Sequence, residues 1–170
     1  MPLPPPRDPD RPYRVCFVCL GNICRSPMAE VVARARLADA GLSAAVLVDS
    51  AGTGDWHIGQ QMNRGARTEL SRRGYDGETH RARQFEPSWL AERDLVLAMD
   101  NSNFKALKSL SRTARGDSAR IRLFGDIAGL DGADIPDPYG GDPAEFARVL
   151  AMLESAMPRL IAEITDRIRV

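Results

Sequence analysis

Four short apolar stretches recur along the chain, each as long as a β-strand. They cover residues 15–18, 45–48, 95–99 and 121–124 and are rich in Val, Ile, Leu or Phe. Apolar runs without polar alternation are typical of strands that are covered on both faces. The pattern therefore predicts four buried strands.

Helical stretches separate and follow these strands. Residues 27–40 precede Gly41, residues 63–73 precede Gly74, and residues 101–110 form a third candidate helix. Glycine after a helix suits a left-handed C-terminal cap. A long amphipathic stretch, with apolar positions from Phe146 to Ile168, ends the chain. Strands that alternate with helices predict a three-layer α/β fold, with a four-stranded parallel sheet flanked by helices on both faces.

The first residues have a different composition. Residues 1–13 hold six of the 12 prolines and several charged residues, and they contain no apolar run of the kind found in signal peptides. Such a segment can bury little surface, so we expect a disordered, proline-rich arm at 1–13 and one domain at 14–170.

Composition excludes several classes of protein. The chain has 23 Lys and Arg against 23 Asp and Glu, so it lacks the basic excess that attracts nucleic acid or an anionic membrane. No apolar run approaches the roughly 20 residues of a membrane span. All three cysteines lie within residues 16–24, which is not a secreted disulfide framework. We therefore expect a cytoplasmic protein, which we take to be a monomer, although export without a signal peptide is left open.

The loop after the first strand carries the strongest chemical pattern. Residues 19–26 read CLGNICRS, and Pro27 then opens a helix, for which Ser26 is the expected N-cap. Unpaired N–H groups and the positive end of the helix dipole form an anion site, where a thiol ionises more readily. Arg25 can grip two phosphate oxygens. A thiolate, convergent amides and a guanidinium predict attack by Cys19 on phosphorus.

The full pattern resembles the low-molecular-weight protein tyrosine phosphatases of the bacterial type, from about residue 15 to residue 167. The matching blocks are VCFVCLGNICRSPMAE, DSAGTGDWHIG, HRARQ from residue 80, LAMD from residue 97 and DPY from residue 137. The resemblance implies a cofactor-free and metal-free hydrolase that dephosphorylates phosphotyrosine in proteins and aryl phosphates. Its partner would be a tyrosine-phosphorylated protein, such as a bacterial tyrosine kinase or a host protein.

The resemblance also implies three catalytic residues. Cys19 would become a phosphocysteine, Arg25 would bind phosphate and stabilise the transition state, and Asp137 would serve as general acid and then general base. The segment from Asp126 to Glu145 holds six acidic residues and no basic residue. Like charges nearby favour the protonated form of a carboxyl group, as a general acid requires.

Further roles follow from the same resemblance. The phosphate-binding loop would comprise Leu20, Gly21, Asn22, Ile23, Cys24, Arg25 and Ser26. Asn22 would hold it in a strained turn through Ser26 and Ser50, with His80 behind the loop. Leu20, Ile23, Trp56 and Tyr139 would wall the substrate pocket. Gly140 stands where the family often has a second tyrosine, and the related protein-arginine phosphatases carry Thr at the position of Ile23.

The other two cysteines allow different readings. Cys16 lies mid-strand and is expected in the core, on the face opposite Cys19, which argues against a thioredoxin-like or zinc role. Cys24 is either a packing residue or a redox partner that captures oxidised Cys19 as a reversible disulfide.

Two rival functions have different sequence requirements. A thiol-dependent arsenate reductase shares the fold and the loop but passes electrons to cysteines further along the chain, and none follows Cys24. A non-catalytic phosphotyrosine-binding module would lack the nucleophile or the acid, whereas both are present.

Overall fold

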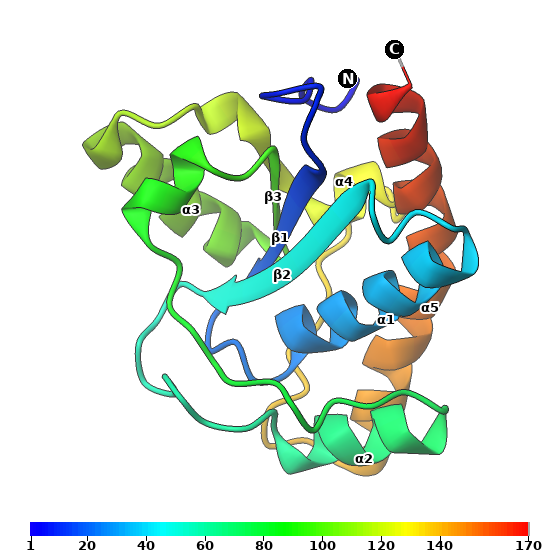
Figure 1. Cartoon of the computed structure of the whole chain (residues 1–170). Coiled ribbons are helices and arrows are strands. Elements are labelled where there is room, and N and C mark those ends of the chain that lie inside the picture. Colours follow the sequence, from blue (N-terminus) through cyan, green and yellow to red (C-terminus); the bar gives the residue numbers. More distant parts are fainter. Residues whose placement is uncertain (170) are drawn as a thin grey trace.

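A computed structural model describes residues 1–169 of the protein. Four parallel strands form one sheet in the order β2-β1-β3-β4 (Figure 1). The strands are β1 (Tyr13–Cys19), β2 (Val46–Gly52), β3 (Leu95–Ala98) and β4 (Ile121–Leu123). All four predicted strands are present, with shifts at their ends. Because β1 lies between β2 and β3, the chain reverses its direction of winding at the carboxyl end of β1, where ligands bind in such sheets.

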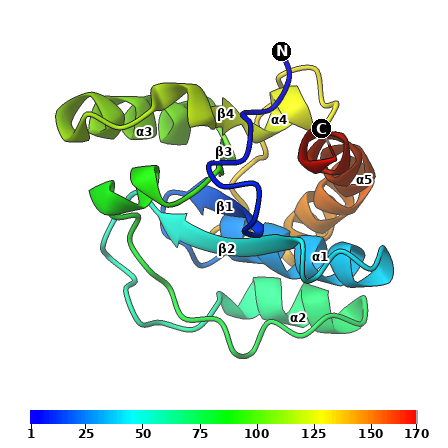
Figure 2. The same cartoon turned by 45° about the horizontal axis from the view of Figure 1, so that its top comes forward.

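Helices cover both faces of the sheet (Figure 2). The helices α1 (Arg25–Asp39) and α5 (Pro143–Ile168) pack on one face, and α2 (Arg64–Arg72) packs against α5. The helix α3 (Asn101–Ala114) covers the other face beside a 3-10 turn, η1 (Pro87–Ala91). A second 3-10 turn, η2 (Ser118–Arg120), precedes β4, and the short α4 (Phe124–Ile127) follows it. The predicted three-layer α/β fold is confirmed.

Alternation along β1 divides the core in two. Val15, Phe17 and Cys19 belong to the cluster formed with α1 and α5, whereas Cys16 and Val18 belong to the cluster beneath α3. Successive side chains of a strand point to opposite faces, so the two cysteines of the C-x-x-C string are separated by the sheet. Cys16 is a core residue, as the sequence predicted.

The start of α1 corrects one prediction. Cys24, not Ser26, occupies the N-cap position, and no side chain caps this helix end. The hydroxyl of Ser26 instead contacts the thiol of Cys19 and donates to the carbonyl of Ala51. The serine is therefore used by the loop and the sheet, and the backbone N–H groups at the helix end are not satisfied by a side-chain cap.

The proline-rich arm differs from the prediction of disorder. It has no helix or strand before Tyr13, yet Leu3 is buried in the core, and the carbonyl of Pro4 accepts a 2.9 Å hydrogen bond from Tyr13. Arg7 donates its backbone N–H to Asp94 at 2.7 Å and its side chain to the carbonyls of Arg93 and Leu90. These groups, more than 80 residues away, hold the arm at the edge of the sheet where β1 begins (Figure 1).

In the described part of the chain, no helix combines the length and apolarity that crossing a bilayer requires.

Candidate active site

The loop between β1 and α1 leaves the sheet at its carboxyl edge. Cys19 is the last residue of β1 and Arg25 the first of α1. The loop passes close to the end of β2, where a Cβ atom on Gly52 would lie 2.7 Å from the carbonyl oxygen of Leu20. Only glycine lets the loop approach β2 this closely.

The thiol of Cys19 lies among hydrogen-bond donors. Its Sγ is 3.0 Å from Oγ of Ser26, and it accepts a 3.3 Å hydrogen bond from the backbone N–H of Asn22. The N–H of Asn22 stabilises negative charge on the sulfur, and the hydroxyl of Ser26 does so when its single hydrogen points to the sulfur instead of the carbonyl of Ala51.

Several backbone N–H groups of the loop are unpaired. Those of Gly21, Ile23 and Cys24 have no acceptor within residues 1–169. Buried N–H groups without a partner are rare in proteins. Together with the uncapped end of α1, they form a site for an anion of the size of phosphate.

Asn22 holds the loop in shape. Its φ angle is 56°, in the left-handed region that few residues other than glycine enter. Its side-chain amide donates to the hydroxyls of Ser26 and Ser50, both at 2.9 Å, and its Oδ1 accepts from the backbone N–H of Arg83 at 2.8 Å. The structure thus brings together Asn22, Ser26 and Ser50, as predicted from the resemblance.

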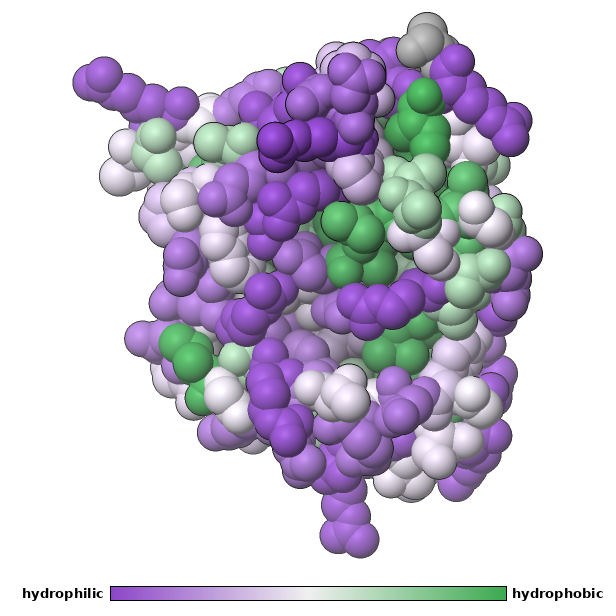
Figure 3. All heavy atoms as spheres, in the orientation of Figure 1, coloured by the Kyte–Doolittle hydropathy of each residue, from purple (hydrophilic) through white to green (hydrophobic). Residues whose placement is uncertain are grey.

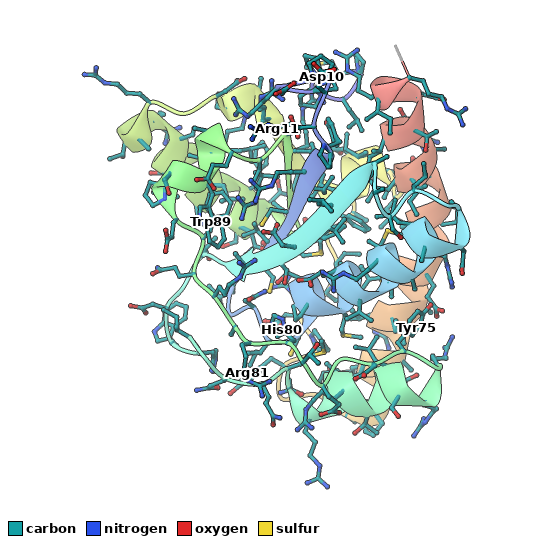
Figure 4. All side chains as sticks on the ribbon, viewed as in Figure 1. Asp10, Arg11, Tyr75, His80, Arg81 and Trp89 are labelled. Atoms are coloured by element: carbon teal, nitrogen blue, oxygen red, sulfur yellow. The ribbon has the colours of Figure 1, made fainter. Side chains whose placement is uncertain are left out.

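His80 supports the same loop from the segment after α2 (Figure 4). Its Nε2 lies 2.7 Å from the carbonyl oxygen of Asn22, so this nitrogen donates its hydrogen. Burial lowers the pKa of His80, although the hydrogen bond to Asn22 and the charge of Glu30 oppose this shift. The neutral tautomer with hydrogen on Nε2 therefore suits the site.

Arg25 is buried, with 3% of its surface exposed, and it faces two carboxylates. It donates to Oδ2 of Asp100 at 2.7 Å and to the carbonyl of Ile135 at 3.0 Å, and it lies 3.7 Å from Oδ2 of Asp137. Burial lowers the pKa of Arg25, but the hydrogen bond to Asp100 and the charges of Cys19, Asp100 and Asp137 outweigh burial and raise it. The guanidinium is therefore a fixed positive charge beside the thiol.

Sequence reasoning missed Asp100. This residue follows β3 at the carboxyl edge and caps α3, because its Oδ1 accepts from the N–H of Asn103 at 2.7 Å. Its other carboxylate oxygen orients Arg25. The position of Asp100 at a strand end, in the LAMD block, was the only sequence signal for a role in the site. The sequence does not show that it pairs with Arg25, because the two residues are 75 positions apart.

A cleft of about 150 Å³ opens above the loop. It is lined by Cys19, Leu20, Gly21, Ile23, Cys24, Arg25, Trp56, His57, Asp137 and Tyr139. The structure therefore brings together the three predicted catalytic residues and the four predicted wall residues. His57 also lines the cleft, although the sequence analysis did not place it in the substrate pocket. The centroid of its ring lies 6.1 Å from that of Tyr139.

Cys24 lines the cleft as well, but its thiol is buried. Burial raises the pKa of Cys24 to about 12, and the nearby charges of Cys19 and Asp137 raise it in the same direction. Cys24 is therefore a protonated thiol at neutral pH.

Residues 14–169 match the family model described as low molecular weight phosphotyrosine protein phosphatase. The chain belongs to this family. A low molecular weight protein-tyrosine-phosphatase of Streptomyces coelicolor is 48% identical over 160 residues, which cover 92% of this chain and 96% of that protein. The low molecular weight protein-tyrosine phosphatase A of Mycobacterium tuberculosis is 41% identical over 160 residues, covering 92% and 94% of the two chains.

Solved structures agree with this assignment. The crystal structure of YfkJ from Bacillus subtilis superposes with a TM-score of 0.82 at 36% identity, covering 91% of this chain and 96% of that chain. A protein tyrosine phosphatase from Entamoeba histolytica superposes with a TM-score of 0.83 at 33% identity, covering 91% and 97% of the two chains. The protein is a phosphatase of this family, and proteins that contain phosphotyrosine are its class of substrate.

Proposed function

We propose that Cys19, Arg25 and Asp137 hydrolyse protein phosphotyrosine in two displacements. The observation that carries the proposal is their meeting in one cleft, with the thiol at the end of β1, the buried guanidinium, and a carboxylate 3.7 Å from that guanidinium. In the first step the sulfur of Cys19 bonds to phosphorus while the bond from phosphorus to the phenolic oxygen breaks. Asp137 gives its proton to the departing oxygen.

The second step returns the enzyme to its starting state. Asp137, now a carboxylate, takes a proton from a water molecule, whose oxygen bonds to phosphorus while the bond to sulfur breaks. Phosphate leaves, and Cys19 is again a thiolate. The N–H of Asn22 stabilises the sulfur as it departs, and the hydroxyl of Ser26 adds a second hydrogen bond by turning its hydrogen from the carbonyl of Ala51 to the sulfur.

Arg25 and the unpaired loop amides bind the phosphate oxygens in both steps. Because Asp100 and the carbonyl of Ile135 already orient the guanidinium, little reorganisation is needed when charge develops in the transition state. The apolar walls formed by Ile23, Trp56 and Tyr139 suit an aromatic ring. A phenyl phosphate group therefore fits the cleft in both charge and shape.

The test is hydrolysis of an aryl phosphate and of a phosphotyrosine peptide by the parent protein and by Cys19→Ser. We expect turnover by the parent only, while Cys19→Ser retains phosphopeptide binding. Binding without hydrolysis by the parent would favour a non-catalytic module. Robust arsenate-dependent consumption of thiols would favour an arsenate reductase.

Cys24 extends the proposal to redox protection. Both Cys19 and Cys24 line the cleft, so a sulfenic acid on Cys19 would meet a thiol that can displace its oxygen as water and form a disulfide. A thiol reductant would then restore both cysteines. After brief peroxide treatment we expect the parent, but not Cys24→Ser, to recover activity with such a reductant. Equal recovery would assign Cys24 to packing alone.

The proposal also covers the substrate protein, the oligomeric state and the cellular location. The substrate is a tyrosine-phosphorylated protein such as a bacterial tyrosine kinase or a host protein, and the enzyme acts as a monomer in the cytoplasm. Three free cysteines, one of them the nucleophile, suit a reducing compartment. Capture of phosphoproteins by Cys19→Ser from the producing cell and from a host lysate tests the two partners, and sedimentation tests the monomer.

A further inference from the structure

A short segment between α2 and η1 runs past the carboxyl end of β2 (Figure 1). The carbonyl of Arg83 accepts a 2.8 Å hydrogen bond from the N–H of Gly52, the last residue of β2, and the N–H of Phe85 donates to the carbonyl of Gly52 at 2.7 Å. The N–H of Arg83 donates to Oδ1 of Asn22 at 2.8 Å. The backbone of Arg83 therefore joins the end of the sheet to the phosphate-binding loop.

The side chain of Arg83 is held by three groups. Its Nη2 donates to Oδ2 of Asp49 and to the carbonyl of Ser50, both at 3.1 Å, and its guanidinium carbon lies 4.8 Å from the ring centroid of Trp89. These contacts hold the side chain although 45% of it is exposed. A planar guanidinium stacks on an aromatic ring while it donates in its own plane, a combination that the ammonium group of lysine does not offer.

A buried arginine fixes the partners of Arg83. The side chain of Arg93 is 3% exposed and donates from Nη2 to Oδ2 of Asp49 at 2.6 Å, and its guanidinium carbon lies 4.5 Å from the ring centroid of Trp89. Hydrophilic side chains predominate on the face of the molecule in front of β2 (Figure 3). Ion pairs on such a surface usually contribute little, because two mobile side chains must be ordered. Here the carboxylate and the ring are already ordered, so only the side chain of Arg83 has to be.

We infer that Arg83 is a positioning residue for the phosphate-binding loop and acts through Asn22. This inference rests on the proposed function. The side chain of Asn22 ends in a planar amide, so the hydrogen bond that fixes Oδ1 also directs Nδ2 to the hydroxyls of Ser26 and Ser50. The carbonyl of Ser50 gives a second link, because it accepts from Arg83 while the hydroxyl of Ser50 accepts from Asn22. Arg83 thus sets the orientation of the residue whose N–H donates to Sγ of Cys19 at 3.3 Å.

The experiment is a double-mutant cycle with Arg83→Ala and Asn22→Gly. It measures kcat/KM with an aryl phosphate and the dissociation constant of inorganic phosphate by calorimetry. Arg83→Ala should lower kcat/KM and weaken phosphate binding, each by on the order of tenfold. In the Asn22→Gly background, which lacks the amide, the same substitution should change either quantity by less than about twofold. Arg83→Lys keeps the charge but not the planar group, so it should give an intermediate loss.

Arg81→Ala is the matched control, because Arg81 is an exposed arginine of the same segment but donates to the carbonyls of Glu78 and His80 instead of the loop. This variant should keep the parental kcat/KM and phosphate binding. A loss equal to that of Arg83→Ala would overturn the inference, since it would show a general effect of lost positive charge.

Two further results would also overturn the inference. Equal losses from Arg83→Ala in both backgrounds would show that Arg83 acts independently of Asn22. A lowered urea midpoint with parental kcat/KM and phosphate binding would show that Arg83 only stabilises the fold. If Arg83→Ala does not fold, the cycle is run with Arg83→Lys and the same outcomes decide. A parent that binds phosphate but hydrolyses no substrate would instead refute the proposed function, while calorimetry would still test the link between Arg83 and Asn22.

Discussion

Substituting Asn22 by glycine and by alanine separates the two contributions that shape the phosphate-binding loop. Both substitutions remove the side-chain hydrogen bonds to Ser26, Ser50 and the N–H of Arg83. Of the two substitutes, only alanine has a Cβ atom, which is unfavourable at a backbone φ of 56°. The pair of variants therefore measures the hydrogen bonds and the backbone conformation independently.

The expected magnitudes follow from these contacts. Each hydrogen bond contributes about 1 kcal/mol to stability, so the loss of all three in Asn22→Gly should lower the free energy of unfolding by about 3 kcal/mol. A left-handed conformation costs alanine about 1 kcal/mol more than glycine, so Asn22→Ala should lose about 4 kcal/mol. A domain of this size has about 5–15 kcal/mol of stability, so both variants should still fold.

Urea denaturation gives the free energies of unfolding, and kcat/KM with an aryl phosphate reports on the loop. Activity should fall in both variants, further with alanine than with glycine. Asn101 is the control site, because it is the first residue of α3 and has no positive φ. At this site the order should reverse, so that Asn101→Ala is more stable than Asn101→Gly. An Asn22→Ala variant as stable as Asn22→Gly would refute the backbone argument, and a loss below about 1 kcal/mol in both would refute the hydrogen-bond argument.

Three further predictions concern other parts of the molecule. Asp137→Asn should lower kcat for a phosphotyrosine peptide by about 10²–10⁴-fold, and by much less for an aryl phosphate whose phenol leaves without protonation; equal losses would argue against the acid role. Burial lowers the pKa of His80 below 6.5, so only the unfolded chain binds a proton just below pH 6.5. The free energy of unfolding should therefore decrease as the pH falls through this range, measured by urea midpoints, and the decrease should be smaller in His80→Gln. Arg7→Ala removes two side-chain hydrogen bonds of the amino-terminal arm and should lower the free energy of unfolding by about 1–3 kcal/mol without changing kcat, because the arm lies at the opposite edge of the sheet. An unchanged urea midpoint would show that the arm does not stabilise the domain.

The strands and helices were largely predictable because the information that determines them is local. Runs of β-branched and aliphatic residues mark β1 to β4, and Gly41 and Gly74, both with positive φ, follow the ends of α1 and α2. The phosphate-binding loop was equally predictable from the sequence, since its thiol, its glycine and Arg25 lie within seven consecutive residues. Elements that depend on neighbours in the chain can be inferred from the chain alone.

Features that depend on distant partners were not predictable in this way. The arm looked disordered because its composition cannot form a core, but Leu3 and Arg7 use a surface provided by residues 90–94 and by the domain core. Asp100 orients Arg25 across 75 residues, and Ser26 is engaged by Cys19 and Ala51 instead of capping α1. Composition does not specify which polar groups will meet after folding.

The sequence by itself determined which reactive atoms the loop carries and that they follow a buried strand. Only the tertiary structure decided their environment, because β1 lies between β2 and β3 and thus places the loop against Gly52, Ser50 and Asp100. A hydrogen bond stabilises a thiolate or a guanidinium only when donor and acceptor lie about 3 Å apart. That spacing is set by the packing of strands and helices, and it joins residues that are far apart in the sequence.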